Sequence, residues 1–289
     1  MKLSEFWDGI KLGSNHREAV LGIDFDLQEC DRLYELYQKN HNEFFNEVLK
    51  KEKNSLWFLW LYSNMACEVY SHYKEEGISE EIFWNTFQDI RFWCENTERE
   101  FGIMGLAVYE WFYRHIDMVL FRFGRLQFEK MKMQCSVSGK ADETGKECFR
   151  SEKEKCEKYN PVENVKIEKG TEVINIHIPQ GEALNWEACE SSIKQAKEFL
   201  GDDKLYVCHS WLLYPGLDEV LSERSNIREF RKHFRVLEVD YKEREAEWRV
   251  FGKVLKNVAE YPEETSLQKK VKTYLLEGKC LGNGWAVLE

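Results

Sequence analysis

The sequence predicts an all-helical first part, residues 1–120, and a second part, residues 121–289, in which helices flank a mixed sheet. Two observations predict this α+β or α/β class. Apolar and aromatic side chains recur at helical spacing through the first part, whereas from Gly124 onward short runs alternate polar and apolar residues as strands do. The 289 residues, 43% of them hydrophobic, suffice for one large domain or two ordinary ones.

Helix signals follow one another in the first part. Asp26 is a good N-cap for a helix that begins at the next residue, and a second helix is expected over residues 55–74. Gly77 should end that helix, and Ser79 should cap the next one. A further aromatic helix is expected over residues 105–120. These aromatic stripes are typical of a packed core rather than of a cofactor site.

The second part alternates strands with helices. Gly124 begins a strand pattern, and the charged residues 138–160 predict a flexible loop or insertion. Thr265 and Gln268 have the spacing of a capping box. Pro215 makes a straight helix after residue 211 unfavourable. The expected elements are strands at 173–178, 205–209, 235–240 and 247–252 and helices at 185–200, 211–221 and 266–277, with an antiparallel pair near the end.

Histidines end two of these strands, at His177 and His209. A strand–helix–strand order makes the strands at 173–178 and 205–209 parallel and adjacent, so their carboxyl ends open on one side. Strand parity places Asn175 and His177 on one face and the isoleucines on the other. Parity also points Cys208 away from His209. The two histidines therefore predict one cleft between the strand ends.

Composition excludes several classes of protein. The net charge of −11 argues against nucleic-acid binding, which needs clustered Lys and Arg. No apolar signal-peptide core opens the chain, and no apolar run is long enough to span a bilayer, so a cytoplasmic location is expected. Nine cysteines without a C-x-x-C pair predict buried or free thiols rather than a disulfide framework or a metal site.

Six motifs stand out along the chain: His177-Ile178-Pro179-Gln180-Gly181-Glu182-Ala183-Leu184, Cys208-His209-Ser210-Trp211-Leu212-Leu213, Ser225-Asn226-Ile227, Phe251-Gly252, Thr265-Ser266-Leu267-Gln268 and Gly124-Arg125-Leu126-Gln127-Phe128-Glu129. They resemble those of bacterial acyltransferase-domain proteins that carry a helical N-terminal domain and a GNAT-like C-terminal domain, in the N-acyltransferase superfamily. The resemblance spans nearly the whole chain.

This resemblance implies that acyl-CoA or acetyl-CoA lies between two splayed strands and gives its acyl group directly to an amine of a small molecule or peptide. It also implies that the pyrophosphate rests on the turn before a helix. The implied contacts with the co-substrate are Ile178, Gln180, Gly181, Glu182, Ala183, Leu184, Ser210 and Asn226. The superfamily's turn, Q/R-x-x-G-x-G/A, is represented here by a single glycine and carries an anion at Glu182, so an acyl-carrier protein is the alternative thioester donor.

Acyl transfer needs a base, oxyanion donors and an acid for the leaving thiolate. His177 is a candidate base, or a structural histidine that ties the turn at Pro179. His209 is a candidate base or thioester contact, or a buried, hydrogen-bonded imidazole. The superfamily often places a tyrosine acid after this strand, which implies that role for Tyr214; otherwise Tyr214 is a packed aromatic. Ser210 is expected to cap the following helix.

Asn226 either forms a turn or contacts substrate. Two other functions stay open. The chain could be a non-catalytic ligand- or partner-binding protein with a GNAT-like fold, which the atypical turn favours. It could also be a hydrolase built on Cys208, His209 and Ser210, although strand parity makes Cys208 and His209 a poor nucleophile–base pair.

Overall fold

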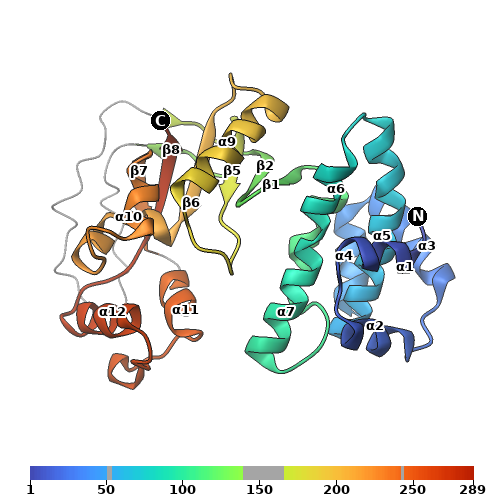
Figure 1. The fold of residues 1–289 in the computed structure, drawn as a ribbon, viewed down its shortest axis with the longest axis horizontal. Coiled ribbons are helices and arrows are strands. Elements are labelled where there is room, and N and C mark those ends of the chain that lie inside the picture. The colour runs from blue at the N-terminus through green and yellow to red at the C-terminus, as the bar shows by residue number, and fades with distance from the viewer. Residues whose placement is uncertain (51–53, 139–165, 242–243) are drawn as a thin grey trace. The chain divides into compact units, whose positions relative to one another are not determined.

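The computed structural model describes residues 1–50, 54–138, 166–241 and 244–289. It forms two compact units, residues 1–123 and residues 124–289 (Figure 1). The loop predicted over residues 138–160 lies, beyond its first residue, outside the described ranges. Helices in the first unit and a mixed sheet with helices in the second confirm the predicted fold class.

The first unit is helical. Its elements are α1 (Leu3–Gly9), α2 (Ser14–Leu21), α3 (Leu27–Lys39), α4 (His41–Lys50), α5 (Ser55–Glu75), α6 (Glu80–Phe87), α7 (Asp89–Phe101), the 3₁₀ turn η1 (Tyr109–Phe112), α8 (Tyr113–Ile116) and the strand β1 (Leu120–Phe123). The caps at Asp26 and Ser79 are confirmed, since each side chain accepts a hydrogen bond from the first turn of its helix.

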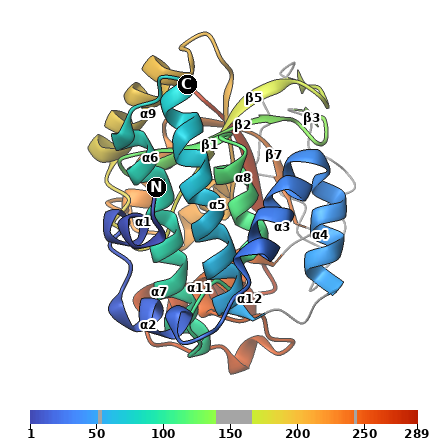
Figure 2. The same cartoon turned by 90° about the vertical axis from the view of Figure 1, so that its right-hand side faces the viewer.

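Helix α5 is the centre of the first unit. Figure 2 shows it among the other helices, and it is contacted by α1, α2, α3, α6 and α8. Its six consecutive residues 57–62 are all buried, so the helix has no solvated face along this stretch. A helix that is apolar all round needs cover on every side, and its neighbours provide it.

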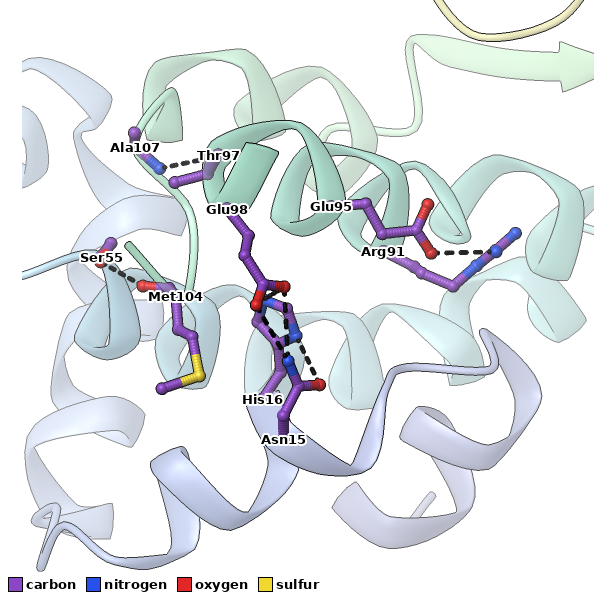
Figure 3. A network of polar contacts seen from close by, with 9 residues as sticks. All are labelled: Asn15, His16, Ser55, Arg91, Glu95, Thr97, Glu98, Met104 and Ala107. Carbon is purple, nitrogen blue, oxygen red and sulfur yellow. Dashed lines mark hydrogen bonds and ion pairs between the residues drawn. The ribbon is translucent and has the colours of Figure 1, made fainter. Parts of the chain in front are cut away.

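A polar network joins α2 to α7 within the first unit (Figure 3). The His16 side chain is only 3% exposed; its Nδ1 atom lies 3.1 Å from Asn15 Oδ1 and its Nε2 atom 3.9 Å from the Glu98 carboxylate. Burial lowers the pKa of His16, and the negative charge of Glu98 offsets part of that effect.

The second unit carries most of the sheet. Its elements are β2 (Leu126–Lys132), β3 (Val137–Ser138), β4 (Lys166–Ile167), β5 (Glu172–His177), α9 (Trp186–Leu200), β6 (Tyr206–Ser210), the 3₁₀ turns η2 (Trp211–Leu213) and η3 (Pro215–Glu219), α10 (Asn226–Arg231), β7 (Phe234–Asp240), α11 (Glu245–Phe251), η4 (Val258–Glu260), α12 (Ser266–Leu276) and β8 (Asn283–Leu288). The capping box predicted at Thr265 and Gln268 opens α12.

The six-stranded sheet has the order β1-β2-β5-β6-β8-β7, and β3 and β4 form a separate hairpin. The parallel neighbours predicted from the chain order, β5 and β6, are confirmed. The face of Ile174 and Ile176 is buried, as parity predicted. The other face is apolar towards the start of β5, where Val173 joins a cluster with Val207 and Val287, and polar towards its end.

Three element predictions were wrong. The predicted strand over residues 247–252 starts with alternating polar and apolar side chains, yet residues 247–251 belong to α11, whose end is fixed by Gly252 in a left-handed conformation with φ +70°. The expected helix after residue 211 is two 3₁₀ turns separated at Tyr214, because Pro215 interrupts it. The expected aromatic helix over residues 105–120 is η1 followed by the four-residue α8.

Candidate active site

The pairing between β5 and β6 ends before either strand does. Their parallel ladder contains Ile174 opposite Tyr206 and Asn175 opposite Val207, and no further pair among the described residues. Strand β5 nevertheless continues to His177, paired with β2, and β6 continues to Ser210, paired with β8. The two strands therefore separate at their carboxyl ends.

Backbone groups alternate sides along a strand, and Ile174 N–H bonds to Leu205 O across the ladder, so Ile176 of β5 and His209 of β6 direct their backbone groups to the gap beyond the last pair. A strand edge within a sheet offers N–H donors and C=O acceptors, which need water or a ligand as partners. An extended amide-containing molecule can supply such partners by lying between the strands as an added strand would. The place is the one at which the sequence predicted a cleft.

His177 lies at the end of β5 in a polar group on one face of the sheet. The His177 Nε2 atom is 2.7 Å from the Glu129 carboxylate of β2, and the Asn175 amide lies 3.2 Å from the same nitrogen. The side chain of Glu129 is 8% exposed and that of His177 is 23% exposed. His177 is thus tied to β2 by a carboxylate.

His209 lies flat on Trp285 of β8. The two rings are 4.3 Å apart and inclined by 14°, and Trp285 is the residue opposite His209 in the ladder. The His209 Nε2 atom is buried and has no hydrogen-bond partner in the described ranges. Burial lowers the pKa of His209, and the charges of Asp240 and Glu245 only partly counteract it. His209 is therefore neutral near pH 7.

The residues on either side of His209 have structural surroundings. Cys208 is 1% exposed, and burial raises the pKa of its thiol, so the reactive thiolate is disfavoured. Ser210 accepts a hydrogen bond from the Leu212 N–H at 3.2 Å and caps η2, which confirms the predicted cap. Gly284 faces Ser210 across the ladder, where any side chain would collide with the Leu213 backbone.

Two further candidates lie beyond β6. The Tyr214 side chain is 5% exposed and belongs to a buried apolar cluster, with its hydroxyl 3.3 Å from that of Tyr274. Asn226 is the first residue of α10, which Ser225 caps. The structure brings His177, His209 and Ser210 to the ends of adjacent strands. It places Tyr214 in the core formed with α12 and Asn226 at a helix start.

The turn that follows β5 is held by an arginine that the sequence reasoning did not single out. Arg125 is 6% exposed, and its guanidinium donates hydrogen bonds to the carbonyl oxygens of Glu182 at 2.9 Å and Ala183 at 3.2 Å. Gly181 adopts φ +108°, a conformation that only glycine takes readily. The residues of the turn, from Gln180 to Ala183, are exposed and open to a ligand.

Helix α9 begins directly after this turn. Asn185 caps it by accepting a hydrogen bond from the Ala188 N–H at 3.3 Å. Trp186 stacks on His233, with ring centroids 3.4 Å apart, which fixes the first turn of α9 against the end of α10. A capped helix start gives the turn a partial positive charge, as an anion site requires.

Glu129, Arg125 and Trp285 are the neighbours of the predicted residues that the sequence reasoning missed. The sequence carried a signal for Glu129, since the alternation that predicted its strand places Glu129 and Gln127 on the face opposite Phe128. No strand was expected where β8 lies, so no local signal in the sequence pointed to Trp285.

No cluster of three potential metal ligands occurs among the residues that the structure describes. Among the described residues, the cysteines at 30, 67, 94, 135, 189 and 208 are free thiols, whereas Cys280 is disulfide-bonded. None of the helices in the described part combines the length and apolar character needed to cross a bilayer.

Comparison with known proteins identifies the family. The model of an N-acyltransferase N-terminal domain matches residues 1–118, and that of a GNAT-like C-terminal domain matches residues 120–288. No curated protein matches the chain.

Solved structures share the fold. An acyltransferase in complex with decanoyl-CoA has a TM-score of 0.70 at 18% identity, over 99% of this chain and 86% of that one. A complex with decanoyl-CoA and teicoplanin gives the same score and identity over 99% and 87%. An acyltransferase mutant in complex with octanoyl-CoA has a TM-score of 0.69, again at 18% identity and over 99% and 87%. The chain belongs to the family in which an N-acyltransferase N-terminal domain precedes a GNAT-like C-terminal domain.

Proposed function

We propose that this protein transfers an acyl group from acyl-CoA to an amine. The observation that carries the proposal is the early end of the β5–β6 ladder, beyond which the backbone groups of Ile176 and His209 face the gap and can pair with the amides of a pantetheine arm. Family membership supports the same activity. The pyrophosphate of the co-substrate is proposed to rest on the turn of residues 178–184, before α9.

The reaction is direct. The amine nitrogen bonds to the thioester carbonyl carbon, the carbon–sulfur bond breaks, and CoA leaves as a thiolate that takes up a proton. His177 accepts the proton of the attacking amine, because it ends β5 and is oriented by a carboxylate. His209, kept neutral by its apolar surroundings, contacts the thioester carbonyl as a hydrogen-bond donor.

Tyr214 is proposed as the acid for the thiolate. Its hydroxyl group is bonded to that of Tyr274, so a second hydroxyl is at hand to share the proton. Ser210 and Asn226 are proposed to line the co-substrate, Ser210 with a side chain that also caps η2.

The ligands of the structural neighbours support a choice of donor and acceptor. Three of these neighbours hold decanoyl-CoA or octanoyl-CoA, one of them together with teicoplanin. Medium-chain acyl-CoA and an amine-bearing small molecule are therefore the first pair to test, with an acyl-carrier protein as the second donor.

A thermal-shift titration with acetyl-, octanoyl- and decanoyl-CoA tests the proposal. A ligand present at a free concentration of about 100 times its Kd stabilises the folded state by about 2.7 kcal/mol, which raises the melting temperature measurably. Release of free CoA thiol in the presence of amines then reports turnover. No stabilisation by any thioester would overturn the proposal, and binding without turnover towards any amine would favour the non-catalytic alternative.

A further inference from the structure

In the hydrogen bond between Glu129 and His177, the donor and the acceptor can be assigned. A carboxylate only accepts hydrogen bonds, so at a separation of 2.7 Å the proton between Glu129 Oε2 and His177 Nε2 lies on the nitrogen. A neutral imidazole carries one proton, which leaves the lone pair on Nδ1. The Asn175 amide nitrogen, 3.2 Å from the same Nε2, is a donor and would favour the other tautomer. The contact with Glu129 is shorter and involves a charged group, so it outweighs that of Asn175 and selects the Nε2–H tautomer of His177.

The sheet holds this contact rigidly. Glu129 lies on β2 opposite Asn175, and His177 lies two residues further along β5 on the same face. Both strands are hydrogen-bonded at these positions, and the Glu129 side chain is 8% exposed. A carboxylate that is held in this way keeps a fixed position beside the ring, shielded from most of the solvent.

A nearby residue offers a natural comparison. Gln127 is the direct partner of His177 in the β2–β5 ladder, shares the face of Glu129 and is 2% exposed. Its amide carries no charge. The charge of Glu129 is thus the property that distinguishes the two buried polar side chains of β2 that flank His177.

We infer that Glu129 is a positioning residue that fixes His177 as the Nε2–H tautomer and thereby makes Nδ1 the atom that accepts the proton of the amine. The inference rests on the proposed function for the proton transfer itself. When Nδ1 takes up that proton, the imidazolium forms next to the Glu129 carboxylate, which stabilises its positive charge.

The experiment combines nitrogen-15 NMR with kinetics on the full-length protein. Long-range ¹H–¹⁵N spectra identify the tautomer of a neutral histidine, and a His177→Gln variant assigns the signals of His177. The variants are Glu129→Met, which removes the acceptor, Glu129→Gln, which keeps an acceptor oxygen without the charge, and Gln127→Met, the matched control on the same strand.

We expect the wild type and Gln127→Met to show the Nε2–H tautomer, and Glu129→Met to lose it. With octanoyl-CoA and an accepted amine, Glu129→Met should lower kcat at least about 100-fold with little change in KM, because the base is misoriented while the co-substrate still binds. Glu129→Gln should keep the tautomer and recover part of kcat.

An Nδ1–H tautomer in the wild type, or an Nε2–H tautomer that survives in Glu129→Met, would overturn the inference. A KM effect without a kcat effect would do the same. If Glu129→Met fails to fold, Glu129→Gln decides the question through its intermediate kcat, and equal kcat values for it and the wild type contradict the role of the charge. A wild type without turnover counts against the proposed function only, since the tautomer is read without substrate.

Discussion

The imidazole of His209 is stacked on the indole of Trp285, at a ring separation of 4.3 Å. This contact joins β6 to β8 across a directly opposed pair and shields one face of the histidine from water. It explains why burial dominates the titration of His209 although two carboxylates, Asp240 and Glu245, attract its proton.

Trp285→Leu should raise the pKa of His209 towards its ordinary value, because solvent reaches the exposed ring face. A histidine NMR titration measures it. Trp285→Phe keeps an aromatic cover and is the matched control, for which we expect a smaller rise. An unchanged His209 pKa in Trp285→Leu would show that other neighbours cause the desolvation.

Arg125→Met should weaken acyl-CoA binding, because the carbonyl groups of Glu182 and Ala183 lose their donor and the turn loosens. Hydrogen bonds to a charged group contribute about 1.5–3 kcal/mol each, so we expect at least a ten-fold rise in Kd. Isothermal titration calorimetry measures this. Arg125→Lys keeps the charge without the two-pronged geometry and should recover little. Equal Kd values for Arg125→Met and the wild type would show that this turn does not contribute to binding of the co-substrate.

Glu182→Gln should tighten CoA binding by up to about five-fold at low salt, since a unit charge some 4 Å from a phosphate charge costs about 1 kcal/mol in water. The gain should shrink as salt screens the repulsion. Glu198→Gln, an equally exposed change near the far end of α9, is the control and should leave Kd unchanged. An identical gain in CoA affinity for both variants would mean that the net charge of the protein, and not the position of Glu182, determines the affinity.

His16→Gln should make the protein less sensitive to acid. Because burial lowers the pKa of His16, the unfolded chain takes up a proton below about pH 6.5 that the folded chain refuses until lower pH, so stability falls as the pH drops from 6.5 to the folded-state pKa. Melting temperatures at pH 7 and pH 5 measure the loss. His72→Gln, whose wild-type side chain is 44% exposed, is the control. An equal fall in melting temperature from pH 7 to pH 5 in the wild type and in His16→Gln would contradict the prediction.

Cys208 should resist alkylation in the native protein, since its thiol is buried and its raised pKa disfavours the thiolate. Iodoacetamide followed by peptide mass mapping measures this, and the exposed Cys135 is the internal control. Rapid labelling of Cys208 would restore the hydrolase alternative.

Local chemistry made much of the chain predictable. Helix caps act within one turn, so Asp26, Ser79 and Ser210 could be recognised from neighbouring residues alone. The period of a strand placed Asn175 and His177 on one face, and chain order made β5 and β6 parallel neighbours. The alternation at residues 247–252 misled because six residues fit a short helix as well as a strand.

The sequence by itself determined the two-part fold, the parity of the strands and the two histidines at their ends. Only the tertiary structure decided what surrounds those histidines. Glu129 reaches His177 across 48 residues of sequence, and β8 inserts between β6 and β7 to lay Trp285 on His209. Such contacts depend on strand order and register, which arise from packing of the whole sheet and leave no periodic trace in any one segment.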